Sequence, residues 1–171
     1  YGSKSADVAK SHANIGNNLL LIKQLEDAVF HLEEAIRIGN QQVEDTPLDL
    51  GAVYSSLAYA HELLGDMRQA NTNYYKALEI KQFTFEKDHP ELIPTLTNLG
   101  IFLFNTKKFE ASKEIYERAL RIQLDSVDFL HPVTANLYTN IGNCLLELKD
   151  YESALAHQLK ALAIFSNKNV E

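Results

Sequence analysis

Six histidines and one cysteine are the residues in this sequence of 171 whose side chains could ligate a metal ion or take part in nucleophilic catalysis. No His-Glu-x-x-His pair occurs, and the glycines are scattered singly rather than gathered in a phosphate-binding loop. His89 and His131 each precede a proline, which predicts that they begin helices. Cys144 is followed by Leu145 and Leu146, a setting typical of a packed thiol. The sequence therefore predicts no enzyme activity, no metal site and no cofactor.

Asparagine is the residue whose spacing suggests a binding chemistry. Asn98 and Asn140 lie 42 residues apart, and Asn14 lies twice that distance before Asn98, with Ser56 at the intermediate place. A primary amide offers two donors and two acceptor lone pairs, so one Asn can pair with both the N–H and the C=O of an extended peptide. A row of such residues would bind peptide backbone without requiring a particular sequence. The alternative is that these amides only hydrate a helix face or bond a neighbouring helix.

The same spacing of 42 residues runs through the whole chain. Segments 11–38, 53–80, 95–122 and 137–164 align on one another without a gap. In each segment, residues without bulk return at three places, as expected where two helix axes cross closely. These small residues are Gly16, Ala28 and Ala35, then Ala58, Ala70 and Ala77, then Gly100, Ser112 and Ala119, and last Gly142, Ala154 and Ala161. The chain is therefore an internal repeat of helices.

Polar breaks divide each segment into two antiparallel helices. The breaks within segments are Lys23-Gln24, Gly65-Asp66, Lys107-Lys108 and Lys149-Asp150. The breaks between segments contain proline, which favours the first turn of a following helix: Glu44-Asp45-Thr46-Pro47, Asp88-His89-Pro90 and His131-Pro132. We therefore expect an all-α fold of four helical hairpins in one domain over 1–171, with repeats at about 9–47, 51–89, 93–131 and 135–168. The absence of an initiator Met predicts that the chain is a fragment of a longer array.

The pattern of large and small residues resembles the tetratricopeptide repeat, most clearly in Leu99-Gly100, Phe109, Tyr116 and Ala119. The usual tetratricopeptide period is about 34 residues. The period of 42, with Asp-His-Pro between repeats, is similar to the kinesin light chain subclass. The resemblance implies a right-handed superhelical solenoid whose concave side is lined by the first helix of each pair. Repeats of this length also occur in polarity adaptors, signalling sensors and bacterial peptide receptors.

Helical spacing along the first helix of each repeat selects the candidate partner contacts. Tyr59, Ile101 and Phe104 would supply apolar contacts in the middle of the groove. The resemblance implies that the repeated Asn holds a peptide backbone. The same spacing places Ala13 and Ser55 on this face. The candidate contacts are Asn14, Asn17, Tyr59, Asn98, Ile101, Phe104, Asn105, Asn140 and Asn143.

The remaining histidines carry little information about a site. His61 occupies a packing position at which the other repeats have leucine, so we expect it to be partly buried. His12, His31 and His157 show no pattern of partners in the sequence.

Charge limits the kind of partner. The formal net charge is -7, and no cluster of Lys and Arg stands out, so we expect no nucleic-acid partner and no membrane partner. A clamp for acidic peptide tails needs Lys or Arg on the inner face of successive repeats, where Lys10 is followed by Pro94 and Asn98. The sequence therefore predicts a protein or peptide partner that is not strongly acidic. A single cysteine suits a reducing compartment and predicts a cytoplasmic location.

Three functions are compatible with these features. The leading hypothesis is a non-catalytic module that binds a peptide or protein segment in its groove, for example as a cargo adaptor for a motor or scaffold. The first alternative is a peptide sensor that switches an attached effector. The second alternative is a structural repeat that self-associates as a homo-oligomer, because the last predicted helix has an uncovered apolar face. That face carries Leu155, Leu159, Leu162 and Phe165.

Overall fold

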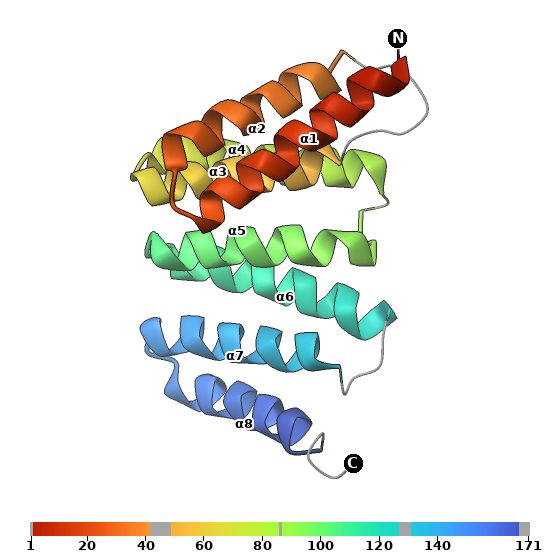
Figure 1. Ribbon diagram of the computed structural model, residues 1–171. Helices are drawn as coiled ribbons and strands as arrows, with labels where there is room; N and C mark the ends of the chain where they lie inside the picture. Colours follow the sequence, from red (N-terminus) through yellow and green to blue (C-terminus); the bar gives the residue numbers. More distant parts are fainter. Residues whose placement is uncertain (1, 42–48, 86, 127–130, 168–171) are drawn as a thin grey trace. The chain divides into compact units, whose positions relative to one another are not determined.

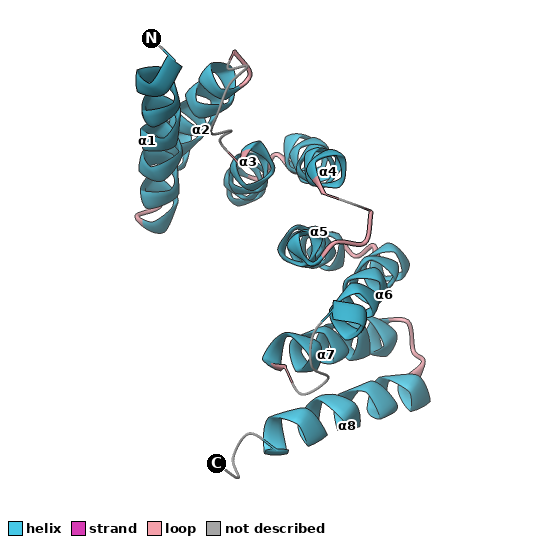
Figure 2. Cartoon of the chain, turned by 90° about the vertical axis from the view of Figure 1, so that its right-hand side faces the viewer, coloured by secondary structure: helices cyan, strands magenta, loops and turns pink. Residues whose placement is uncertain are grey.

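The computed structural model describes residues 2–41, 49–85, 87–126 and 131–167, so the predicted break at 44–47 lies outside the described residues. The chain divides into two compact units, Tyr1–Thr84 and Phe85–Glu171. Helices and loops make up the described part of both units, which contains no strand (Figure 2). The prediction of an all-α fold is therefore confirmed.

Each unit consists of two helical hairpins (Figure 1). The first unit contains α1 (Gly2–Leu21), α2 (Leu25–Gly39), α3 (Leu50–Leu64) and α4 (Met67–Thr84). The second contains the 3-10 helix η1 (Pro90–Leu92), then α5 (Ile93–Asn105), α6 (Phe109–Ser126), α7 (Pro132–Glu147) and α8 (Tyr151–Asn167). Consecutive helices pair as hairpins, and the hairpins of a unit join where α2 packs against α3 or α6 against α7. The eight α-helices of the described residues thus form the four hairpins that the repeat predicts.

The four turns within the hairpins share one backbone geometry. Their central residues have positive φ angles, 61° at Lys23, 82° at Gly65, 61° at Lys107 and 65° at Lys149. In the third turn the N–H of Lys107 donates to the carbonyl of Phe104 and that of Lys108 to Leu103, each at 2.9 Å. The other three turns contain the same pair of bonds. This Schellman arrangement satisfies the last carbonyls of a helix and reverses the chain, which confirms the predicted tight turns.

The small residues lie where the two helices of a hairpin cross. A Cβ added to Gly100 would come within 2.6 Å of Cε1 of Tyr116, and one added to Gly16 within 2.7 Å of Cγ of Leu32. Each of these large side chains therefore packs directly on the backbone of the facing helix. The second hairpin keeps the same contact with Ala58 and the buried Tyr74. The predicted role of the small residues follows from this close packing.

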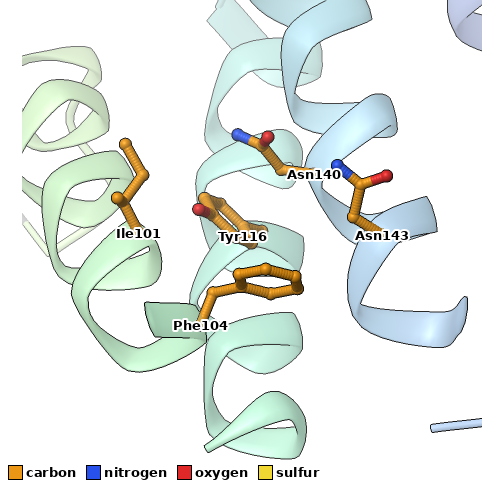
Figure 3. A pocket seen from close by; sticks show the side chains of 5 residues that line it. All are labelled: Ile101, Phe104, Tyr116, Asn140 and Asn143. Carbon is orange, nitrogen blue, oxygen red and sulfur yellow. The ribbon is translucent and has the colours of Figure 1, made fainter. Parts of the chain in front are cut away.

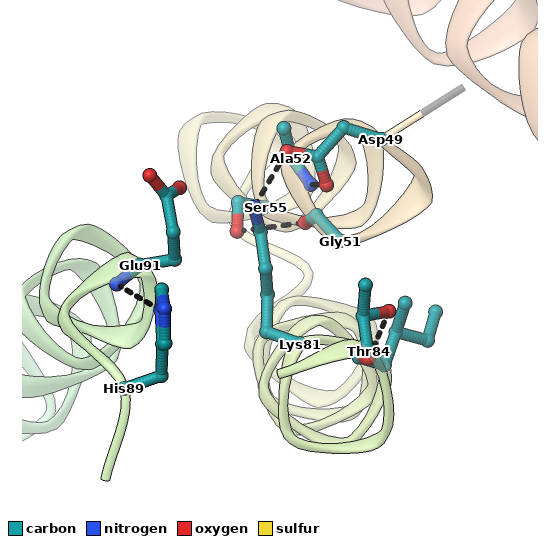
Figure 4. Close-up of polar contacts among 9 residues, drawn as sticks. Asp49, Gly51, Ala52, Ser55, Lys81, Thr84, His89 and Glu91 are labelled. Carbon is teal, nitrogen blue, oxygen red and sulfur yellow. Dashed lines mark hydrogen bonds and ion pairs between the residues drawn. The ribbon is translucent and has the colours of Figure 1, made fainter. Parts of the chain in front are cut away.

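Polar side chains fix where several helices begin. Nδ1 of His89 accepts a hydrogen bond from the N–H of Glu91, and Nδ1 of His131 accepts one from Val133, each at 3.2 Å (Figure 4). Both histidines thus have the predicted place at a helix start. In the first unit, the Asp49 carboxylate accepts from the N–H of Ala52 at 3.0 Å and from Nζ of Lys81 at 2.6 Å (Figure 4). That bond ties the start of α3 to the buried end of α4.

An apolar core joins α2 to α3 in the first unit. Its buried residues are Leu32, Ala35 and Ile36 of α2 with Val53, Leu57 and Ala60 of α3, together with Ala13 of α1. Val29, Leu50 and Tyr54 pack against the edge of this cluster. The second unit buries the corresponding positions of α6 and α7, among them Leu120 and Ile141. His61 is half-buried, as predicted.

Candidate functional site

A cavity of about 180 Å³ opens in the second unit between α5, α6 and α7. Its lining residues come from all three helices (Figure 3): Ile101, Phe104, Tyr116, Asn140 and Asn143. Four of these five are residues that the sequence selects as candidate partner contacts. The structure therefore brings two predicted apolar contacts and two predicted amides to one pocket.

Helical spacing places the side chains of this pocket. Ile101 and Phe104 are three residues apart and share one face of α5, while Asn140 and Asn143 share one face of α7. In Figure 3, Tyr116 of α6 lies between Ile101 and Asn140. An apolar wall thus stands opposite a pair of amides, with an aromatic ring between them.

Neighbouring aromatic rings hold the apolar wall in place. The Phe104 ring is half-buried and meets the Phe109 ring edge to face, with the ring centroids 5.3 Å apart. Tyr116 is buried against Gly100, so its ring cannot turn away from the pocket without a shift of α5. Ile101 is exposed and available to a ligand.

The site lacks charge among the side chains that line it. Burial raises the pKa of the Tyr116 phenol, so this group stays neutral throughout the physiological range. The two asparagines then supply the pocket with amide donors and acceptors. Such a surface suits a neutral group flanked by peptide bonds better than an ion.

Sequence reasoning missed Tyr116 because it assigned the binding face to the first helix of each hairpin. The signal was present in Gly100, since a residue without a side chain lets a large ring of the facing helix come close to the α5 backbone. Tyr116 is also part of the pattern that resembles the tetratricopeptide repeat. Its packing role therefore concealed its place in the pocket.

The other predicted contacts lie outside this pocket. Asn98 and Asn105 are exposed on α5, and in the first unit Asn14 and Asn17 are exposed on α1 and Tyr59 on α3. The placement of Ala13 and Ser55 on an open face is wrong, because both are buried. Ala13 packs into the α2/α3 core, and the Ser55 hydroxyl donates to the carbonyl of Gly51 at 3.1 Å.

Cys144 lies below the site as a packed thiol. Its Sγ donates to the Ser112 hydroxyl at 3.4 Å, and that hydroxyl donates to the carbonyl of Gly100 at 2.7 Å. Burial raises the pKa of the Cys144 thiol, which disfavours the reactive thiolate. The predicted packing role of Cys144 is confirmed.

Two histidines without a sequence signal meet in the first hairpin. Nδ1 of His12 on α1 and Nδ1 of His31 on α2 are 3.1 Å apart, a hydrogen-bonding distance. No group of three or more His, Cys, Asp or Glu side chains in the described part of the chain is placed to hold a metal ion. Within the same residues, no helix is both long and apolar enough to cross a membrane.

The chain is similar to known repeat proteins in sequence. It is 33% identical over 104 residues to tetratricopeptide repeat protein 19, mitochondrial, of Rattus norvegicus, a match that covers 60% of this chain and 27% of the relative. It is 29% identical over 127 residues to the clustered mitochondria protein homolog of Lodderomyces elongisporus, covering 70% of this chain and 9% of that protein. The chain therefore spans less than a third of the length of either relative.

Solved structures share the fold at low sequence identity. BtubC (BKLC) from P. vanneervenii superposes with a TM-score of 0.85 and 18% identity over 95% of this chain and 65% of that one. A putative kinesin light chain of Podosopora anserina gives a TM-score of 0.78 and 16% identity over 95% of this chain and 77% of that one. The family model described as tetratricopeptide repeat matches residues 49–125 and 93–167. The chain therefore belongs to the tetratricopeptide repeat family, whose repeats generally mediate protein–protein interactions.

Proposed function

We propose that this chain is a non-catalytic interaction module that binds an extended peptide segment of a partner protein in the pocket between α5, α6 and α7. The observation that carries the proposal is the meeting of an apolar wall with two amides in one cavity of about 180 Å³. One apolar side chain of the peptide enters the cavity against Ile101 and Phe104. The amides of Asn140 and Asn143 pair with the peptide bonds on either side of it.

The chemistry of the pocket limits its partner. A buried carboxylate or ammonium group of the ligand would lose its hydration without gaining an opposite charge from the lining residues. The net charge of -7 adds a general repulsion of acidic segments, nucleic acid and anionic membranes. The partner segment is therefore neutral or weakly basic, with an aliphatic or aromatic residue at its centre.

The remaining candidate contacts extend this proposal beyond the pocket. Asn98 and Asn105 would bind the continuation of the peptide along α5, and Asn14, Asn17 and Tyr59 would contact partner segments at the first unit. Residues 1–171 would act as one repeat domain with the four predicted repeats. A cargo adaptor for a motor or scaffold and a sensor of an attached effector would both use these contacts.

The cytoplasm is the location that we propose from the single cysteine. The word mitochondrial in the name of the rat relative makes the mitochondrion the competing location. Fractionation of cells that express the full-length protein separates the two.

Peptide selection tests the proposed function. A displayed library of random nine-residue peptides is selected on the immobilised chain, and the affinity of each selected peptide is measured by fluorescence anisotropy. The variant Asn140→Ala/Asn143→Ala should bind about tenfold more weakly or worse, because two hydrogen bonds are each worth about 1 kcal/mol. Ile101→Ser should weaken binding through the apolar wall.

The control variant is Gln69→Ala, which removes an exposed amide from α4 of the first unit. Its affinity for the selected peptides should equal that of the unchanged chain. Equal affinity of the Asn140→Ala/Asn143→Ala variant would exclude the amide pair as the binding element.

Self-association is a second candidate function that a specific observation favours. On α8 the large apolar side chains of Leu155, Leu159, Leu162 and Phe165 are exposed. An apolar surface of this kind on one helix typically contacts another chain or a further repeat.

A further inference from the structure

The apolar residues exposed on α8 correspond to residues that are buried between hairpins elsewhere. Leu162 lies 42 residues after Leu120 and three repeats after Ile36. Leu120 and Ile36 are each 9% exposed, because the next helix covers them, whereas Leu162 is 60% exposed. Leu155 corresponds in the same way to Val29, which packs against the α2/α3 core. The outer side of α8 therefore repeats the side of α2 that receives α3.

The outer side of α1 has the complementary property. Ile15 corresponds to Leu57 of α3 and Ile141 of α7, and Val8 corresponds to Leu50. Leu57 and Ile141 are buried against the preceding hairpin, whereas Ile15 is 42% exposed and Val8 is 47% exposed. The outer side of α1 therefore repeats the side of α3 that packs on α2.

We propose that two copies of this chain associate head to tail, with α8 of one copy packed on α1 of the next in the register of α2 on α3. Leu155 and Leu162 then meet Val8 and Ile15 as Val29 and Ile36 meet Leu50 and Leu57. This inference deepens the self-association named as the second candidate function. Two different surfaces meet in this contact, so each added copy leaves one surface of each kind open and association continues into longer chains.

Two polar residues on α1 make the contact weak. Ser11 and Asn18 stand where α3 has Val53 and Ala60, both buried in the α2/α3 core. Burial of their polar groups opposes association unless they find hydrogen-bond partners. The assembly is therefore reversible and depends on protein concentration.

A complementation experiment on the 171-residue chain tests the head-to-tail contact. Leu162→Glu closes the α8 surface and leaves α1 open, while Ile15→Glu closes α1 and leaves α8 open. Sedimentation velocity should show a series of species that grow with concentration for the unchanged chain and a monomer for each variant alone. An equimolar mixture of the two variants should form a dimer and no larger species.

Two results would overturn the proposal. A concentration-independent monomer of the unchanged chain excludes the contact, and a dimer of Ile15→Glu alone shows that α8 instead pairs with a second α8. Circular dichroism checks that the variants fold, and Leu155→Glu with Val8→Glu provides a second complementary pair. Ser11→Val/Asn18→Ala should strengthen association about tenfold, since it restores the apolar residues of α3.

The peptide pocket provides an independent readout. Leu162→Glu and Ile15→Glu lie outside the residues that line the pocket and should leave the affinity for selected peptides unchanged. Failure of the head-to-tail contact is thereby distinguished from failure of peptide binding.

Discussion

Buried hydroxyl groups in the second unit differ in how well their surroundings satisfy them. The Ser112 hydroxyl has both a donor and an acceptor partner, in Cys144 and Gly100. Thr134 is fully buried, and its Oγ1 has no hydrogen-bond partner in the described part of the chain. The other repeats have Val8, Leu50 and Leu92 at this place.

Thr134→Val should therefore raise the free energy of unfolding by about 1 kcal/mol, because it replaces an unsatisfied hydroxyl with a methyl group of the same shape. Urea unfolding followed by circular dichroism measures the change. Ser112→Ala serves as the matched variant and should lower the free energy of unfolding, since it removes a satisfied hydroxyl. A destabilised Thr134→Val chain would show that the hydroxyl has a partner after all.

Single residues also show how far the sequence predicts a site. Ile101, Phe104, Asn140 and Asn143 could be selected because their spacing along each first helix is regular. Tyr116 could not, since it comes from a second helix and reaches the pocket only through the close crossing at Gly100. The contact between two histidines of α1 and α2 was equally hidden, because it occurs in one hairpin and does not repeat.

At the scale of elements, the hairpin turns contain a local conflict between residue type and backbone. Lys23, Lys107 and Lys149 adopt a left-handed conformation that costs an ordinary residue about 1 kcal/mol. Gly65 adopts it at the same place in the second hairpin, where a Cβ would meet no atom within 4 Å. The repeat predicted where these turns lie, but only Gly65 signalled their backbone geometry.

Lys107→Gly should raise the free energy of unfolding by about 0.5 kcal/mol, because the strain that it removes exceeds the added entropy of the unfolded chain. Gly65→Lys is the reciprocal variant and should lower the free energy of unfolding by about 1 kcal/mol. Thermal unfolding of both variants measures the changes. Opposite signs for the two would show that lysine makes a compensating contact in this turn.

The helices themselves were predictable because helix-forming residues, small crossing residues and turn residues all recur with one period. The histidines before proline illustrate this agreement, since they cap η1 and α7 as expected. What the period could not indicate was which copies leave a surface uncovered. The exposure of Leu162 and Ile15 follows from the helices that cover, or fail to cover, each face.

At the scale of the whole molecule, the chain combines an uncharged pocket in one unit with an acidic net charge. Membership of the tetratricopeptide repeat family fits the role of a protein that binds other proteins. Its specific ligand is expected to be recognised through peptide bonds and one apolar side chain. The open sides of α1 and α8 are separate from that pocket and would determine association between copies.

Nuclear magnetic resonance tests the proposed pocket most directly, because side-chain amide groups and isoleucine methyl groups give separate signals. A peptide selected from the displayed library is titrated into the isotope-labelled chain. Peptide binding at the pocket predicts that the amide signals of Asn140 and Asn143 and the methyl signals of Ile101 shift together with one dissociation constant. Shifts confined to other residues, with these signals unchanged at saturation, would contradict the account.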